Sequence, residues 1–527
     1  MSRARIHPKR HQALRVTRLR MAGAFVAWWL AAFIVLSNIW ITTNFGQLEL
    51  PQFVYHVVNL AEVIKPMPLG FVILSAVLIF GLPTALATMA VWFMRRLAKF
   101  RDAGVTYLFW EKPQGLVRAM RHVVAYSQAA LIGLLVPLLV LGVTAPSLAT
   151  NVGVFSFVQN SKPSEFIEQF YEFPAPITVP DEKMNLVTIY VESLENTYRE
   201  EELWGENLLA SLDEATADWT TFENFREVRG TGWTIAGIVA SQCGVLLKEE
   251  NSFDLRQQLG LKSINRIGER VDEFMPGITC LGDVLDQAGY TNVFMGGADP
   301  EFAGKGKFFE DHGYDRVMGR PYWEMRGETE FTKWGLNDDK LLGYAREELD
   351  ALYAAGQPFN LTVLTVDTHR PEGHISETCA RRGVEDLPGV VKCTSDMIAD
   401  FIGYMEQQGY LENTAVVVTG DHLTMPNVVQ DIIDQEPNRT IYNRFYSPEP
   451  LTPNRDELMH FSIFPTILDM LNFSYPGDGV GLGVSAVKPL QHDRETIYDV
   501  ADLDDQLRRP SELYELFWGI TSSSQSD

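Results

Sequence analysis

Four residues with metal-binding side chains stand at the ends of short apolar runs of this sequence. In chain order they are Glu192, His369, Asp421 and His422. Carboxylate oxygens combined with an imidazole nitrogen suit manganese or zinc, and they are also compatible with magnesium. A helix cap is the structural alternative for each residue taken singly. Together they predict a site for one divalent cation, with manganese as the favoured ion.

The candidate nucleophile lies in the glycine-rich segment 230–237, which reads Gly-Thr-Gly-Trp-Thr-Ile-Ala-Gly. Thr234 opens a helix-like run that continues to Cys243. Backbone N–H groups at a helix N-terminus can hold a phosphate oxygen, and coordination to a cation lowers the pKa of a hydroxyl. Thr234 could instead be a helix cap. Thr231 and Ser241 are rival hydroxyls that spacing does not exclude.

The elements around these residues predict an α/β fold. Apolar and β-branched runs indicate buried strands at 185–191, 292–295, 360–366 and 414–419. Amphipathic segments indicate helices near 280–288, 338–355 and 394–408. Strands that alternate with helices are typical of a parallel sheet covered on both faces. Ligands of such sheets gather at the carboxyl ends of the strands, which is where the candidate metal ligands stand.

Three long apolar stretches precede this region, at about residues 21–43, 69–94 and 123–148. Each supplies the roughly 20 apolar residues that a helix needs to cross a bilayer. A buried core helix is the alternative, but soluble helices rarely stay apolar on every face over such a length. A cleaved signal peptide fits poorly because the first stretch is long and further stretches follow it. The sequence therefore predicts a three-helix transmembrane anchor.

The charge distribution predicts how this anchor is oriented. The first twenty residues contain seven basic residues and no acid, and the segment 95–122 has a similar basic excess. Basic flanks tend to stay cytoplasmic, so the N-terminus is predicted inside and everything after about residue 150 outside. The whole chain carries a formal net charge of −24. A basic tip on an acidic body argues against nucleic acid as a partner.

All four cysteines lie in the predicted external part of the chain. They are Cys243, Cys280, Cys379 and Cys393. An even number in an oxidising compartment predicts two disulfides. Proximity in the sequence favours the pairs 379–393 and 243–280 among the three pairings. Structural zinc is the alternative, although the spacings match no compact zinc motif.

These patterns divide the sequence into four parts. Residues 1–150 form the predicted anchor, and residues 151–183 form a connector that contains prolines and a short helix near 166–171. Residues 184–520 form the predicted external catalytic domain. The serine-rich residues 521–527 are expected to be disordered.

Four motifs of the external part occur in the same order in a known group of enzymes. They are Val191-Glu-Ser, Gly232-Trp-Thr, Asp367-Thr-His-Arg-Pro and Gly420-Asp-His. Through them, residues 185–471 resemble the lipoteichoic acid synthase group of the alkaline phosphatase and sulfatase superfamily. Segment 230–237 and the following Ala240-Ser-Gln-Cys-Gly look closer to the phosphoglycerol transferase branch. That branch decorates osmoregulated periplasmic glucans with phosphoglycerol from phosphatidylglycerol.

The resemblance implies roles for the residues at the centre of the site. Glu192, Asp421 and His422 match the metal ligands of the group. Thr234 matches its nucleophile, whose oxygen also touches the metal. The implied fold is an alkaline phosphatase or sulfatase-like parallel-sheet domain behind the transmembrane anchor.

The resemblance also implies residues that contact the substrate. His369 matches a histidine at the substrate head group, and Lys305 stands where lipoteichoic acid synthases have arginine. Lysine meets a phosphate as a point charge, without the bidentate geometry of arginine. Ala303 replaces a tryptophan, which removes an aromatic wall there and favours the glucan branch. The motif that starts at Trp334 recurs in the group without an assigned role.

The resemblance therefore implies a transferase in a bacterial cytoplasmic membrane with a periplasmic catalytic domain. Phosphatidylglycerol would be the donor, Thr234 would carry the phosphoglycerol group, and periplasmic glucan would be the acceptor. A phosphoethanolamine transferase acting on lipid A or glucan is an alternative with the same anchor and site. A sulfatase fits less well, because its Cys/Ser-x-Pro-x-Arg motif is absent at Thr234. An inactive membrane-anchored lipid or glucan sensor is the alternative from another class.

Overall fold

The computed structural model describes most of the chain as two compact units, Met1–Ser161 and Lys162–Asp527. The described residues are 8–46, 50, 53–54, 57, 69–108, 131–155, 162–174, 176–248, 271–489 and 495–520. The predicted tail 521–527 lies outside them, as does the beginning of the third predicted span, residues 123–130.

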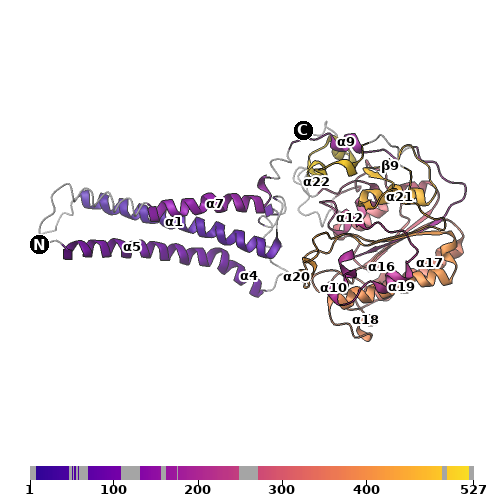
Figure 1. Cartoon of the computed structure of the whole chain (residues 1–527), viewed down its shortest axis with the longest axis horizontal. Helices are drawn as coiled ribbons and strands as arrows, with labels where there is room; N and C mark the ends of the chain where they lie inside the picture. Colours follow the sequence, from indigo (N-terminus) through magenta and orange to yellow (C-terminus); the bar gives the residue numbers. More distant parts are fainter. Residues whose placement is uncertain are drawn as a thin grey trace. The chain divides into compact units, whose positions relative to one another are not determined.

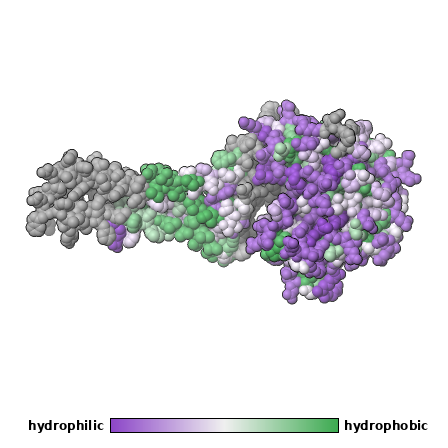
Figure 2. All heavy atoms as spheres, in the orientation of Figure 1, coloured by the Kyte–Doolittle hydropathy of each residue, from purple (hydrophilic) through white to green (hydrophobic). Residues whose placement is uncertain are grey.

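The first unit consists of apolar helices. Its described helices are α1 (Pro8–Phe45), α4 (Leu69–Ala76), which continues through a π-helical turn (Val77–Gly81) into α5 (Leu82–Leu108), and α7 (Val136–Asn151), which follows a π-helical turn (Leu131–Leu135). The segments long and apolar enough to cross a membrane are Met21–Asn44, Leu69–Arg96 and Gly133–Asn151. Figure 2 shows hydrophobic surface on these helices, whereas the second unit is mainly hydrophilic. The three predicted apolar helices are therefore present.

The second unit is built on a six-stranded sheet of order β4-β3-β5-β1-β6-β7. The strands are β1 (Asn185–Val191), β3 (Thr291–Gly296), β4 (Arg316–Met318), β5 (Phe359–Leu364), β6 (Thr414–Gly420) and β7 (Asn443–Tyr446). The four predicted strands are confirmed. The predicted parallel sheet is confirmed for β4, β3, β5, β1 and β6, and the edge strand β7 runs antiparallel to β6. Neither β4, with three residues, nor β7, which contains Asn443 and Arg444, has an apolar run that would predict it.

Helices cover both faces of the sheet. Every residue of β1 is buried, and both faces must be covered because successive side chains point to opposite faces. The covering helices are α12 (Thr234–Cys243), α14 (Leu281–Gln287), α17 (Asp338–Ala355), α19 (Leu387–Gln407) and α21 (Ile463–Met470). Val187, Ile189 and Val191 share a core with α17 and α19. Leu186 and Tyr190 point the other way, into cores shared with α21 and α14 and with α12. Figure 1 shows the same two layers, with α17 and α19 on one side of the strands and α12 and α21 on the other.

Helix α19 begins seven residues before its predicted start at residue 394. Asp386 caps it, since the Asp386 side chain accepts a hydrogen bond from the Gly389 N–H at 2.9 Å. Pro388 fits the first turn, where a backbone N–H would have no partner within the helix. The predicted boundary missed this start, although the buried Leu387, Val390 and Val391 already follow helical spacing.

Shorter elements complete the second unit. They are α9 (Phe166–Phe170), α10 (Glu201–Trp204), α11 (Ala210–Ala215), β2 (Asn224–Phe225), α15 (Lys305–Asp311), α16 (Arg320–Met325), α18 (Glu377–Arg381), α20 (Gln430–Ile433), β8 (Glu457–Leu458), β9 (Gly479–Val480), β10 (Gly483–Val484), α22 (Leu503–Arg508) and α23 (Glu512–Phe517). Phe166, Ile167 and Phe170 of α9 are buried in the core of this unit. The later part of the predicted connector therefore packs against the globular unit.

Two disulfides join helices of the second unit, and they are the two pairings favoured by proximity. Cys243 at the end of α12 is bonded to Cys280, the residue before α14. Cys379 of α18 is bonded to Cys393 of α19. The first bond links α12 to the start of α14, and the second links α18 to α19.

We expect the double substitution Cys379→Ser with Cys393→Ser to lower the free energy of unfolding. The bond closes a loop with a sequence separation of 14. Loss of a disulfide that closes a loop of this length lowers the free energy of unfolding by about 3 kcal/mol. Urea unfolding of the purified chain, followed by tryptophan fluorescence, measures the change. Reduced wild-type protein is the control, and an unchanged midpoint in the variant would contradict the prediction.

Candidate active site

Glu192, Asp421 and His422 meet at the carboxyl edge of the sheet. Strands β1 and β6 are neighbours, and Val191 pairs with Gly420. The next residue of each strand, Glu192 and Asp421, therefore leaves the sheet at the same level. Imidazole Nε2 of His422 lies 3.5 Å from Oε1 of Glu192 and 3.5 Å from Oδ2 of Asp421. One ligand atom from each of the three buried residues lies within 4.8 Å of the others.

The donor atoms of this triad fit a divalent cation. Asp421 Oδ1 accepts hydrogen bonds from the N–H groups of Ser193 and His422, at 2.8 and 2.9 Å. Asp421 Oδ2 is buried and has no hydrogen-bond partner among the described residues. His422 Nδ1 lies 2.7 Å from the carbonyl oxygen of Leu423, which can only accept, so Nδ1 carries a proton. A neutral His422 therefore presents the Nε2 lone pair to the two carboxylates, as a metal ligand does.

The same geometry favours a proton on His422 when no cation is bound. Burial by itself lowers the pKa of His422, but the carboxylates of Asp421 and Glu192 outweigh burial and raise it to about 9. Burial raises the pKa of Asp421. The imidazolium proton and a divalent cation both neutralise these carboxylates, so the two compete for the site.

Thr234 lies at this triad, and the two rival hydroxyls do not. Its Oγ1 is 3.3 Å from Oε2 of Glu192, at the first residue of α12. Thr231 is buried and donates to the Val228 carbonyl at 2.6 Å. Ser241 is buried two residues before the C-terminal end of α12 and donates to the Ile238 carbonyl at 3.0 Å. The structure thus selects Thr234 among the three hydroxyls as the one beside the candidate metal ligands.

Helix α12 reaches the triad because a glycine faces it. A Cβ atom on Gly237 would lie 2.1 Å from the carbonyl oxygen of Asp421. His460 approaches the same oxygen with Nε2 at 2.9 Å. Burial lowers the pKa of His460 to about 4, so its ring is neutral and Nε2–H donates this bond. The backbone of Asp421 is therefore held between α12 and His460.

His369 lies in a pocket beside Thr234 and stacks on Trp334. The pocket is also lined by Glu192 and Lys305. The ring centroids of His369 and Trp334 are 4.0 Å apart. Burial lowers the pKa of His369, and Nδ1 of the neutral ring donates to the Arg370 carbonyl at 2.9 Å. His369 Nε2 is therefore left as a hydrogen-bond acceptor.

Lys305 supplies the positive charge of this pocket. Its side chain is buried, with Nζ 3.2 Å from the Phe302 carbonyl oxygen and 4.8 Å from the centre of the Phe302 ring. Burial lowers the pKa of Lys305 to about 8, against the opposing effect of Glu192 and Asp421. Lys305 is therefore cationic at neutral pH. Although residue 303 is an alanine, the pocket still has an aromatic wall, because Phe302 and Trp334 line it.

A pair of buried carboxylates braces the loop that carries His369. Asp338 accepts hydrogen bonds from the N–H groups of Val366 and Asp367, at 2.7 and 3.0 Å. In return, Asp367 accepts from the N–H of Asp338 at 3.1 Å. Asp367, which the sequence motif places beside His369, is thus turned toward the start of α17. The motif from Trp334 to Asp338 acquires a structural role that sequence reasoning did not find.

Two other carboxylates that sequence reasoning missed hold the loop after His422. Glu195 bonds the Arg439 guanidinium and accepts from the Thr424 N–H at 2.9 Å. Glu227 accepts from the Leu423 N–H at 2.6 Å. Neither residue directly ends a strand or belongs to one of the four motifs, so no sequence signal distinguished it from a surface acid.

A second cluster of residue types that can bind metals contains a cysteine, but this cysteine is in a disulfide and provides no thiolate. It contains Cys280, Asp283 and His312. Cys280 is bonded to Cys243, and His312 Nδ1 lies 2.9 Å from Asp283 Oδ2 while its Nε2 lies 2.9 Å from the Phe274 carbonyl oxygen. Both ring nitrogens are engaged within the protein, so this group braces the helices around it.

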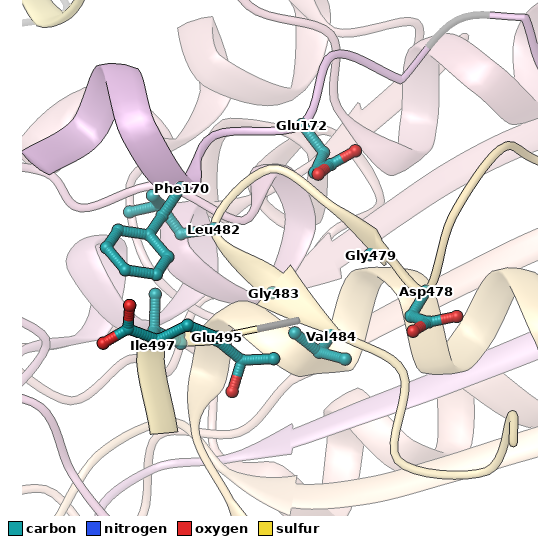
Figure 3. A pocket seen from close by; sticks show the side chains of 10 residues that line it. Phe170, Glu172, Asp478, Gly479, Leu482, Gly483, Val484, Glu495 and Ile497 are labelled. Atoms are coloured by element: carbon teal, nitrogen blue, oxygen red, sulfur yellow. The ribbon is translucent and has the colours of Figure 1, made fainter. Parts of the chain in front are cut away.

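Another pocket lies between α9 and the β9–β10 hairpin. Figure 3 shows three carboxylates on separate sides of it, from Glu172, Asp478 and Glu495. Its described lining contains neither histidine nor cysteine and none of the candidate residues. The arrangement does not converge on one point as the triad does.

Part of the globular unit is similar in sequence to a known protein family. Residues 237–472 match the family model described as Sulfatase. The matched segment includes Lys305, His369, Asp421 and His422, and it begins after Glu192 and Thr234.

The curated homologues of the chain are named phosphoglycerol transferase I. The protein from Xanthomonas axonopodis pv. citri is 36% identical over 287 residues, which is 52% of this chain and 39% of that protein. The protein from Escherichia fergusonii is 34% identical over 334 residues, which is 60% of this chain and 41% of that protein. The chain thus matches less than half the length of each of these relatives.

Solved structures with a similar arrangement are more distant. The lipoteichoic acid synthase LtaP from Listeria monocytogenes aligns with a TM-score of 0.47 at 15% identity, over 67% of this chain and 97% of that one. The C-terminal periplasmic domain of EcEptC from Escherichia coli, in complex with Zn, aligns with a TM-score of 0.44 at 15% identity, over 62% of this chain and 92% of that one.

We expect Gly237→Ala to weaken both the fold and cation binding. The added methyl group would collide with the Asp421 carbonyl and push α12 away from the triad, at a cost of about 1–3 kcal/mol in the free energy of unfolding. Gly343→Ala on α17 is the matched control, since a Cβ there meets nothing within 4 Å. Urea unfolding and calorimetric titration with Mn²⁺ measure the two effects. Equal behaviour of the two variants would contradict the prediction.

We also expect cation binding to release a proton and to strengthen as the pH rises toward about 9. The raised pKa of His422 keeps its proton on the ring below that pH, where it competes with the cation. Titration with Mn²⁺ at pH 7 in two buffers of different ionisation enthalpy should show release of about one proton. His369→Asn should still release this proton, because His369 is neutral. Identical heats in both buffers would count against the prediction.

Proposed function

We propose that the chain is a membrane-anchored, metal-dependent phosphoglycerol transferase. Its donor is phosphatidylglycerol, its acceptor is an extracytoplasmic glycan such as periplasmic glucan, and Thr234 carries the group between them. The observation that carries the proposal is the hydroxyl of Thr234, 3.3 Å from Glu192 in a buried triad of two carboxylates and an imidazole. The curated relatives named phosphoglycerol transferase I support the choice of transferred group.

The proposed reaction has two balanced steps. The Oγ1 atom of Thr234 forms a bond to the donor phosphorus, the bond to the diacylglycerol oxygen breaks, and the threonine proton leaves with diacylglycerol. An acceptor hydroxyl oxygen then forms a bond to the phosphorus, the bond to Thr234 breaks, and the acceptor proton returns to the threonine. Such double displacement predicts ping-pong kinetics.

The residues around Thr234 would stabilise charge on the transferred phosphate. A cation held by Glu192, Asp421 and His422 would supply positive charge against the phosphoryl oxygens, with manganese favoured over zinc or magnesium. The buried ammonium of Lys305 would contribute a second positive charge in the same pocket. Because α12 begins at Thr234, backbone N–H groups of its first residues would add hydrogen-bond donors for a phosphate oxygen. His369 would accept a hydrogen bond from a hydroxyl of the glycerol or the acceptor.

A location in the bacterial cytoplasmic membrane follows from the same proposal. The three apolar helices would span the bilayer with the N-terminus in the cytoplasm, and the globular unit would face the periplasm. The two disulfides of the globular unit support an oxidising compartment. A lipid donor could then react without its acyl chains leaving the bilayer.

We expect purified full-length chain to gain the mass of one phosphoglycerol unit from head-group-labelled phosphatidylglycerol when Mn²⁺ is present. Thr234→Ala should abolish the adduct and lower turnover by at least about a thousandfold. Thr231→Ala is the matched control and should keep the adduct, because that hydroxyl bonds to the Val228 carbonyl. Intact-protein mass spectrometry and release of labelled diacylglycerol measure both quantities, before and after chelation.

Other outcomes of this experiment would replace the proposal. An adduct from phosphatidylethanolamine but not from phosphatidylglycerol would assign the chain to the phosphoethanolamine transferases. No adduct from either lipid in the presence of Mn²⁺ would favour a binding protein without activity.

A further inference from the structure

Exposed apolar side chains gather beside the pocket that contains Thr234. We define this surface as the rim, and its residues are Phe302, Lys333, Arg370, Ile375, Met425 and Val428. The exposed fractions of Phe302, Ile375 and Val428 are 40%, 43% and 61%. Large apolar side chains this exposed cost free energy in water unless something covers them.

Contacts connect the rim to the pocket and join its parts. The Phe302 ring lies edge-on to Trp334, with centroids 5.7 Å apart, and both rings line the pocket. The ammonium of Lys333 lies 6.0 Å from the centre of the Trp334 ring.

The loop of Arg370 joins the other half of the rim. Val428 donates its N–H to the Pro371 carbonyl at 3.1 Å. The Arg370 guanidinium lies 4.0 Å from the sulfur of Met425. The two loops therefore form one surface, which begins at His369 in the pocket wall.

The rim carries two exposed cations in a chain that is acidic as a whole. The formal net charge of the chain is −24, and such a surface is repelled by anionic lipid. At the rim, the exposed cations Lys333 and Arg370 stand beside exposed apolar side chains, and the exposed acids Asp299, Glu301 and Glu372 lie close by in the sequence. Cations next to exposed apolar side chains are typical of surfaces that bind at the headgroup level of a membrane.

We propose that the rim docks on the phospholipid bilayer and presents lipid head groups to the Thr234 pocket. Ile375, Val428 and Phe302 enter the headgroup region, while Lys333 and Arg370 meet lipid phosphates. That the presented lipid is phosphatidylglycerol rests on the proposed function. Docking on a bilayer does not. Three apolar side chains bind a bilayer only weakly by themselves. Attachment to membrane-spanning helices makes weak docking effective, because contact becomes intramolecular.

A fluorescence experiment on the full-length chain in lipid nanodiscs tests docking without any turnover. All four natural cysteines are in disulfides, so Val428→Cys can be labelled selectively with an environment-sensitive dye. Lipids with brominated acyl chains should quench the dye at position 428. Val179→Cys is the control, since Val179 is 38% exposed and follows Thr178, which pairs with Ser474 outside the rim. No quenching at 428, or equal quenching at both positions, would overturn the proposal.

A kinetic experiment tests presentation of the lipid. The double variant Ile375→Ser with Val428→Ser should lower kcat/KM for long-chain phosphatidylglycerol in the bilayer by about tenfold. It should leave kcat/KM for a water-soluble short-chain phosphatidylglycerol unchanged, as should Val179→Ser for both donors. Equal losses with both donors would overturn the role of the rim. If the wild-type chain transfers nothing, the proposed function fails, while the fluorescence result still decides docking.

Discussion

Two buried carboxylates, Glu192 and Asp421, face one imidazole at the carboxyl edge of the sheet, and this concentration of negative charge requires a positive partner. Burying an unpaired carboxylate costs several kcal/mol, so either a proton on His422 or a bound cation must compensate. Asp421 Oδ2 has no hydrogen-bond partner among the described residues, so hydrogen bonds within the protein leave its charge uncompensated. The remainder of the globular unit can be understood as the framework that keeps these charges together.

That framework acts mainly through the backbone around the triad. Asp338 and Asp367 hold the end of β5, and Glu195 with Arg439 holds the loop after β6. Asp338 and Glu195 accept hydrogen bonds from N–H groups of the segments that follow β5 and β6, and Asp367 accepts one from the N–H of Asp338 at the start of α17. The side chains of the site are thereby positioned before any ligand arrives, which is the condition for electrostatic stabilisation without reorganisation.

The apolar helices of the first unit and the globular unit expose different kinds of side chain. Many large apolar side chains of the described helices in the first unit are exposed, and three segments of these helices are apolar and long enough to cross a membrane. The globular unit hides its apolar residues in cores on both faces of the sheet and exposes polar ones. The rim is an exception within the globular unit, and it borders the pocket in which a lipid head group would react.

Much of the fold and part of the site followed from the sequence itself. Continuous apolar runs predicted β1, β3, β5 and β6, and the polar residues after them predicted where ligands would gather, because these signals are local. The antiparallel strand β7, the position of Thr234 rather than Thr231 or Ser241 beside Glu192, and the brace between Asp338 and Asp367 were decided by the tertiary structure alone. Each depends on which distant segments meet, as Thr234 meets Glu192 and Asp338 meets Asp367. Such contacts, and the close approach that Gly237 permits, leave no periodic pattern in the sequence.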